Sequence, residues 1–195
     1  MNEKTPIAFN DALPAVGARH GEILEALESL YERAGNIHYG EDVTQLEHAL
    51  QCASLAYQAN ASDALIVAAL LHDIGHLVGP SDWREENQHD NIGASLLEPF
   101  FDDAVCQPIR LHAHAKRYLC AIEPGYYDAL SEASRHSLQH QGGVMTAEEC
   151  NHFEASEHFK ASIALRRWDD TGKCEQLSGW TFSDFMPFVT KVLNR

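Results

Sequence analysis

The sequence predicts an all-α fold built as one domain. Apolar residues recur at helical spacing along most of the chain, capping-box motifs mark helix starts, and no run alternates apolar and polar residues as a half-buried strand would. At 195 residues, with 45% hydrophobic and 22% charged residues, the chain is large enough to bury a substantial core. The expected domain spans 1–195, with its core at about 36–173 and helices 19–35 and about 181–193 packing on it.

The first two helices have clear boundaries. Segment 19–35 carries apolar residues at helical spacing and stops at Gly35, a residue that commonly follows helix ends. After a short loop, Thr44 and Glu47 form a T-x-x-E capping box. This motif predicts a helix over 45–60.

Caps and punctuating residues place the later elements. Ser62 can cap a helix over 63–77, and the polar segment 79–88, which carries Gly and Pro, is expected to be a loop or lid. Thr146 and Glu149 form a second capping box. The other expected helices lie at 89–101, 102–119, 125–143, about 147–168 and about 181–193.

Charge and cysteine usage exclude several classes of partner. The net charge of −15 argues against nucleic acid or an anionic membrane surface, although a local cluster of Lys and Arg could still hold a small anion. No apolar stretch approaches the roughly 20 residues of a membrane span, and the N-terminus lacks the features of a signal peptide. Five scattered cysteines without a C-x-x-C pair indicate reduced thiols and a cytoplasmic location.

The stretch "ALLHDIGHL" places polar groups in an apolar run. His72 and Asp73 are neighbours on the expected helix, so their side chains diverge by about 100°. Both can serve one metal ion, with the second oxygen of the carboxylate turned toward another ion. His76 then lies on the same face as His72, and Gly75 keeps the helix surface low, leaving room for an ion or substrate. The alternative is a buried histidine hydrogen-bonded to an aspartate.

Further histidines and one aspartate favour the metal hypothesis. Together with the adjacent His72 and Asp73 (the HD pair), they supply four imidazoles and two carboxylates from five segments. Mixed nitrogen and oxygen ligands suit iron, manganese or zinc better than calcium, and six ligands fit two ions bridged by a carboxylate. The six candidates are His48, His72, Asp73, His89, His112 and Asp169.

Five motifs occur in a fixed order within about 36–173: "QLEHALQCA", "ALLHDIGH", "HAHAKRYL", "LSEASRHSLQHQGG" and "RRWDDTGK". With them the chain resembles the HD-domain superfamily, and within it the mixed-valent diiron oxygenases that cleave the C–P bonds of 1-hydroxyphosphonates. The most similar type is 2-amino-1-hydroxyethylphosphonate dioxygenase (glycine-forming), with its trimethylammonio-substrate relatives. Myo-inositol oxygenase is a more distant relative.

The resemblance implies a metal centre of two iron ions, Fe(II) and Fe(III), with O2 as co-substrate. Asp73 is implied to bridge the two ions. The remaining implied ligands are His48, His72 and Asp169 for the first iron, and His89 and His112 for the second.

The resemblance also implies residues that hold the substrate. The catalytic candidates are Asp73, His76 and Lys116. The implied phosphonate-binding residues are His76, Lys116, Ser134, Gln141 and Arg166, with Ser137 a weaker candidate.

A loop before the first metal ligand is implied to read the other end of the substrate. Glu41 matches a glutamate that contacts the substrate's amino group. The family has a tyrosine three residues before this glutamate, where it can occupy the open position of the second iron. Here that position is His38, with Tyr39 next to it, so either residue is a candidate for the role.

The function implied by the resemblance is oxidative C–P cleavage. A 1-hydroxy-2-(amino or trimethylammonio)ethylphosphonate would give phosphate and glycine or glycine betaine, and hydroxymethylphosphonate is a third candidate substrate. An upstream phosphonate 1-hydroxylase is the expected metabolic partner. The competing hypotheses are an HD-type phosphohydrolase that uses the same metals to activate water, and a binding module without catalytic activity.

Overall fold

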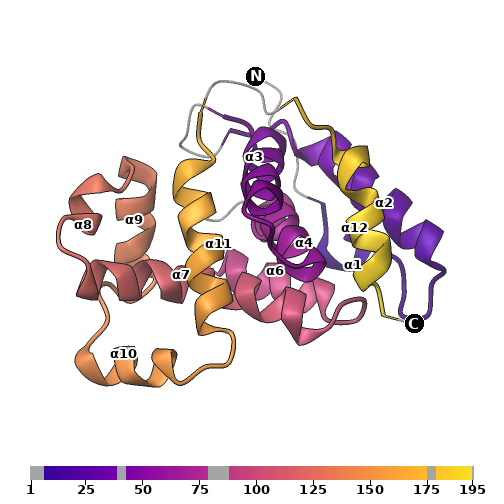
Figure 1. Cartoon of the computed structure of the whole chain (residues 1–195). Helices are drawn as coiled ribbons and strands as arrows, with labels where there is room; N and C mark the ends of the chain where they lie inside the picture. Colours follow the sequence, from indigo (N-terminus) through magenta and orange to yellow (C-terminus); the bar gives the residue numbers. More distant parts are fainter. Residues whose placement is uncertain (1–6, 39–42, 79–87, 175–178, 195) are drawn as a thin grey trace.

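The computed structural model describes residues 7–38, 43–78, 88–174 and 179–194, and every regular element within these ranges is a helix (Figure 1). The all-α prediction is therefore confirmed. Tyr39, Glu41 and nearly all of the expected loop 79–88 lie outside the described residues. The elements are α1 (Phe9–Ala12), α2 (His20–Ala34), α3 (Gln45–Gln58), α4 (Asp63–Leu71), η1 (Ile74–Leu77), α6 (His89–Leu97), α7 (Asp103–Ile122), α8 (Tyr126–Ala129), α9 (Glu132–His140), α10 (Ala147–Glu154), α11 (Phe159–Thr171) and α12 (Phe182–Val192).

Helix α4 lies at the centre of the main core. Its residues from Ile66 to Leu71 are all buried, and it contacts α3, α7, α11 and α12. A helix that is apolar on every side needs neighbours on every side, which explains why its sequence shows no polar face. None of the helices in the described ranges has both the length and the apolar character needed to span a bilayer.

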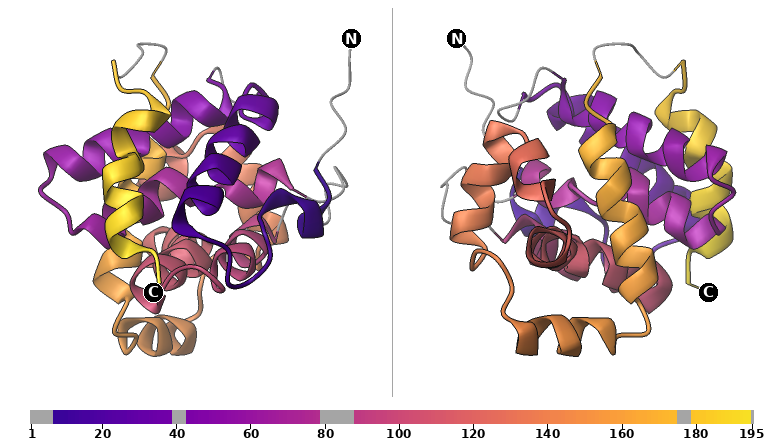
Figure 2. Two further views of the ribbon diagram at one scale, coloured as in Figure 1. Left: turned by 90° about the vertical axis from the view of Figure 1, so that its right-hand side faces the viewer. Right: turned by 60° about the vertical axis from the view of Figure 1, so that its left-hand side comes forward.

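A second, smaller core lies at the other end of α7. Tyr118 of α7 packs its ring against Phe153 and Phe159, with Leu138 of α9 buried in the same cluster. Helix α11 stands between α8–α9 on one side and α3–α4 on the other, in Figure 1 and in the right-hand view of Figure 2. The two cores thus share α7 and support the helices that flank α11.

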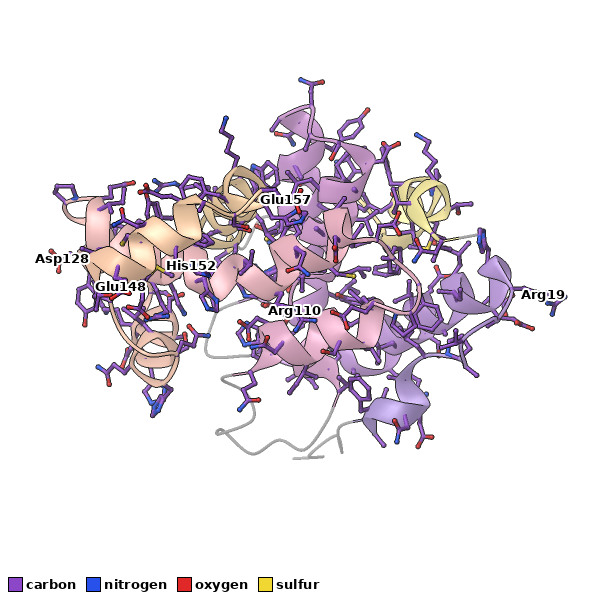
Figure 3. The ribbon with its side chains drawn as sticks, turned by 90° about the horizontal axis from the view of Figure 1, so that it is seen from below. Arg19, Arg110, Asp128, Glu148, His152 and Glu157 are labelled. Carbon is purple, nitrogen blue, oxygen red and sulfur yellow. The ribbon has the colours of Figure 1, made fainter. Side chains whose placement is uncertain are left out.

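The underside of the molecule carries solvated charge. Glu148 and His152 of α10 and Glu157, in the turn before α11, are exposed and point outward in Figure 3. These residues lie in the peripheral lower part of the fold, away from the α4 core.

Three helices expected to be continuous are interrupted. The expected helix 125–143 divides because Ser131 caps a new helix, its hydroxyl accepting from the Ser134 amide. The helix expected at about 147–168 stops at Glu154 and restarts at Phe159. The expected helix 63–77 ends at Leu71 and continues as the 3₁₀ turn η1.

The end of α4 is stabilised by side chains that satisfy its last carbonyls. The hydroxyl of Tyr31 donates to the Leu70 carbonyl at 3.0 Å, and the Nδ1 atom of His72 donates to the Ala69 carbonyl at 2.9 Å. Asp73 then adopts φ −100° and ψ 12°, outside the helical range, so the chain changes direction. His72, Asp73 and His76 consequently do not share one helix, contrary to the prediction.

Gly75 marks a close approach of two backbones. A Cβ atom at this position would lie 2.0 Å from the carbonyl oxygen of His89 at the start of α6. The expectation that Gly75 leaves room for an ion or substrate is therefore wrong, because α6 fills that space. The glycine instead lets His89 approach the HD pair.

The close approach predicts that Gly75→Ala destabilises the fold. The added methyl group would meet a backbone oxygen that cannot rotate away. We expect the free energy of unfolding, measured by urea titration, to fall by about 3 kcal/mol, at the upper end for overpacked sites. Gly21→Ala in α2 is the control, since nothing lies within 4 Å of a Cβ there. Equal stability of Gly75→Ala and the parent would contradict this account.

Candidate metal centre

Six side chains from separate parts of the sequence meet in the interior. All are buried except that of Asp73, which retains 14% exposure at the mouth of a pocket. The structure places all six together, and their role as metal ligands stays a prediction. They are His48 on α3, His72 and Asp73 at the end of α4, His89 on α6, His112 on α7 and Asp169 on α11.

The first group is organised around two imidazoles. The Nε2 atoms of His48 and His72 lie 3.2 Å apart, and the Oδ1 atom of Asp169 lies 3.3 Å from the Nε2 of His48. The Nδ1 of His48 contacts the Gly172 carbonyl at 2.8 Å, as that of His72 contacts a carbonyl of its own helix. A carbonyl can only accept, so Nδ1 carries a proton in both rings, and Nε2 is the nitrogen through which each ring can bind a metal ion. Burial would lower the pKa of His48, but Cys52 and the hydrogen bond to Asp169 raise it well above its ordinary value, so Nε2 also binds a proton when no metal ion is present.

The second group repeats this arrangement. The Nε2 atoms of His89 and His112 lie 2.9 Å apart, and the Nδ1 of His112 donates to the Ile109 carbonyl at 2.7 Å. The Oδ1 atom of Asp73 lies 3.5 Å from the Nε2 of His89 and 3.8 Å from that of His112. This group therefore offers two nitrogens and one carboxylate oxygen.

Asp73 also faces the first group. Its Oδ1 lies 3.5 Å from the Nε2 of His72, and its Oδ2 lies 3.7 Å from the Nε2 of His48. Burial alone would raise the pKa of this carboxyl group, but the surrounding histidines hold it well below its ordinary value. Asp73 is thus an ionised carboxylate with an oxygen available to each group.

The donor atoms fit two metal ions. Two ligands at about 2.0–2.1 Å from one ion lie about 2.8–3.4 Å apart, which matches the nitrogen pairs at 3.2 and 2.9 Å. Two ring nitrogens at this distance need a proton or a metal ion between them. Within the described ranges, the groups able to hold a metal are His48, Cys52 and His72, and Asp73, His89 and His112. Nitrogen and carboxylate donors are typical of iron, manganese and zinc sites.

Arg166 fixes the orientation of Asp169. Its Nη1 donates to the Oδ2 of Asp169 at 2.6 Å, which leaves Oδ1 turned toward His48, and its Nη2 pairs with Asp170. Burial would raise the pKa of Asp169, but Arg166, together with the hydrogen bond to His48, holds it well below its usual range. Arg166 was predicted to hold the phosphonate, and it also positions a candidate metal ligand.

A pocket with three cationic side chains opens onto the two groups. Lys116, Arg166 and Lys173 line it beside Ser134 and Ser137. The Nζ of Lys116 donates to Ser137 at 2.6 Å, and that of Lys173 donates to Ser134 at 3.3 Å. Burial and the neighbouring Arg166 lower the pKa of Lys116 to about 7. The pocket can hold a small anion in an otherwise acidic protein.

The remaining predicted substrate residues occupy different places. His76 lines the pocket and stacks on His89, with ring centroids 4.0 Å apart. Gln141 ends α9 outside the pocket lining, and both polar atoms of its amide are buried without a hydrogen-bond partner. His38 is exposed and pairs with Thr44 in an isolated bridge. The predicted roles of Tyr39 and Glu41 lie outside the described residues.

Two residues at the site were missed in the sequence. Lys173 follows Asp169 by four residues, with its Nζ 3.9 Å from the Oδ1 of Asp169. Cys52 follows His48 by four residues on α3, with its Sγ 3.8 Å from both ring nitrogens of that histidine. The four-residue spacing was a signal for Cys52, which shares a helix face with His48. For Lys173 the spacing was weaker evidence, because α11 ends at Thr171.

Known proteins are similar to this chain over nearly its whole length. Residues 46–150 match the HD domain family. A hydroxymethylphosphonate dioxygenase from Gimesia maris is 42% identical, over 98% of this chain and 96% of the relative. A [1-hydroxy-2-(trimethylamino)ethyl]phosphonate dioxygenase (glycine-betaine-forming) from Leisingera caerulea is 41% identical, over 90% of this chain and 92% of the relative.

The two close pairs of ring nitrogens, His48 with His72 and His89 with His112, predict that a bound metal stabilises the fold. We expect a chelator to lower the melting temperature and added metal to restore it, since an ion at 100 times its Kd contributes about 2.7 kcal/mol. Asp73→Ala removes the carboxylate shared by both groups and should abolish this shift. Calorimetry together with metal analysis measures both effects.

The exposed residue Asp128 provides the control for this experiment. Asp128→Ala should retain the full metal-dependent shift. An Asp73→Ala protein that still holds two ions per chain would contradict the bridging role of Asp73.

Proposed function

This chain belongs to the HD-domain family of phosphonate dioxygenases, and we propose that it is an O2-dependent oxygenase that cleaves the C–P bond of a 1-hydroxyphosphonate. The whole of 1–195 is proposed as one HD domain. The observation that carries the proposal is the position of a cation-lined pocket directly against two adjacent metal-ligand groups. A phosphonate bound there would hold its C1 substituents next to both ions.

We propose that the two ions are iron. Asp73 would contact both of them. As the family resemblance implies, His48, His72 and Asp169 would complete the first site, and His89 and His112 the second. When bound, the irons supply the one-electron redox chemistry and the labile positions that O2 activation requires. The donor set supports iron because it combines neutral imidazoles with two ionised carboxylates.

The protein side chains would bind and orient the substrate. Lys116 and Lys173 bring positive charge to the phosphonate, and Ser134 and Ser137, already bonded to these lysines, present hydroxyl groups at the same wall. Burial and the neighbouring His89 lower the pKa of His76 to about 3, so this ring can hydrogen-bond to the substrate as a neutral group.

The substituent on the phosphonate defines the substrate within this class. The two relatives are named for substrates with and without a trimethylamino group, and this chain is almost equally similar to both. We propose the amino, trimethylammonio and unsubstituted 1-hydroxyphosphonates as candidates, giving phosphate and the matching carboxylic acid. Glu41 and either Tyr39 or His38 are proposed to read the substituent.

The cellular context completes the proposal. A 1-hydroxyphosphonate has to be made by a hydroxylase, which we propose as the preceding enzyme. All five cysteines are free thiols, which supports a reducing compartment such as the cytoplasm.

Phosphate release with O2 uptake tests the proposed reaction. Iron-loaded protein is mixed with each of the three candidates, the two chiral ones as separate enantiomers, in air and under strict anaerobiosis. We expect phosphate to appear only with O2, in equal amounts to the O2 consumed. Release of phosphate from phosphoesters without O2 would instead favour the HD phosphohydrolase.

Lys116 is expected to control substrate affinity. Removing a charged hydrogen-bond donor costs about 1.5–3 kcal/mol, so Lys116→Ala should raise the Kd for the phosphonate by roughly 10- to 100-fold in anaerobic titrations. Lys160, exposed on α11, provides the control variant Lys160→Ala. Unchanged affinity in Lys116→Ala would argue against a phosphonate role.

The lowered pKa of Lys116 also predicts a pH dependence. A group with a pKa of about 7 is protonated below pH 7 and loses its charge above it, so parent affinity should fall as the pH rises past 7. Lys116→Arg keeps the charge and should weaken less over the same range. The ionisation of the substrate itself affects both proteins equally, so the difference between the two curves reports Lys116.

A further inference from the structure

Three hydrogen bonds tie the segment after α11 to α3. The Gly172 carbonyl accepts from the Nδ1 of His48 at 2.8 Å. The amide of Gln51, one turn further along α3, donates to the Cys174 carbonyl at 2.8 Å and accepts from the Cys174 amide at 3.0 Å. Gln51 is buried, so the first metal-ligand group depends on how closely this segment approaches α3.

Gly172 permits that approach. A Cβ atom at this position would lie 2.7 Å from the Sγ of Cys52 and 3.3 Å from the Cys52 backbone nitrogen. The backbone of Gly172 has φ −74°, which any residue can adopt, so the restriction comes from space and not from conformation. Cys52 is fully buried and its thiol contacts the Trp168 carbonyl at 3.5 Å, so it has little freedom to move aside.

The Gly172 carbonyl is also well suited to accept a hydrogen bond from His48. It follows the last turn of α11, where carbonyls have no partner within the helix and carry the partial negative charge of the helix end. The bond to Nδ1 satisfies this carbonyl and leaves Nε2 as the nitrogen of His48 that can bind a metal ion. The same bond directs Nε2 toward His72 and Asp169.

We propose that Gly172 is a positioning residue for the first metal ion. It has no side chain, so it lets its own carbonyl reach His48 and set both the tautomer and the direction of that ring. The inference rests on the proposed metal centre, because His48 is a candidate ligand there. Losing such an outer partner of a ligating histidine typically costs 10- to 100-fold in metal affinity.

The test is a substitution with a designed rescue. Gly172→Ala should weaken the binding of one ion by about 10- to 100-fold in anaerobic Fe(II) titrations, while the ion at Asp73, His89 and His112 keeps its affinity. Combining it with Cys52→Ala removes the sulfur that the new methyl group meets and should restore affinity to the level of Cys52→Ala alone, which is the reference because Cys52 belongs to the same candidate metal-binding group. Gly21→Ala serves as control, and melting temperatures show that each variant is folded.

A metal-independent measurement separates this inference from the proposed function. In metal-free protein, the Nδ1 proton of His48 should give a slowly exchanging downfield NMR signal that Gly172→Ala loses and the double variant regains. Gln51→Ala, which removes two of the three bonds without adding atoms, should give the same selective loss if Gly172→Ala does not fold.

The outcomes are distinct. Full binding of both ions by Gly172→Ala, or a folded double variant that binds the first ion more weakly than Cys52→Ala alone, would overturn the positioning role. A parent protein that keeps the NMR signal and binds no metal would overturn the proposed function instead, and leave the hydrogen bond intact.

Discussion

The metal centre depends on where three imidazole protons are held. In His48, His72 and His112 the Nδ1 proton is hydrogen-bonded to a backbone carbonyl, so every Nε2 faces the interior and is the nitrogen that can bind a metal ion. For His72 and His112 the acceptor lies three residues earlier in the same helix, so local geometry is sufficient. For His48 the acceptor belongs to another helix, and this ring is correct only after α3 and α11 have packed. A cation is the natural partner for the resulting array.

The cationic side chains of the pocket have two kinds of partner. Arg166 is buried and donates to Asp169 and Asp170, so it neutralises carboxylates close to the candidate ions. Lys116 and Lys173 donate to serine hydroxyls, which are weaker partners that a substrate anion can replace, although Lys173 also lies 3.9 Å from Asp169. A chain with a net charge of −15 can therefore attract a dianion, because its local cations are placed where the acidic surface does not reach.

Helix starts were predictable from the sequence because their caps are local. Thr44 and Ser62 cap the helices that they were expected to cap. The end of α4 was not predictable, since it depends on Tyr31, which is 39 residues from the carbonyl it contacts. The start of α9 was missed although its cap, Ser131, is local. The site shows the same contrast between local sequence signals and long-range packing. The six clustered side chains were found through motifs, whereas Lys173 and the role of Gly172 depend on the packing of α11 against α3.

The break after His72 explains how one carboxylate can face both groups. Ending α4 at Leu71 turns the chain, and Gly75 then allows the backbone of His89 to lie against it. His89 thereby reaches the Oδ1 of Asp73 while His48 stays near Oδ2. The two metal-ligand groups therefore lie side by side because α4 stops at Leu71. His72 and Asp73, the polar residues of the apolar run, stand at the end of that helix.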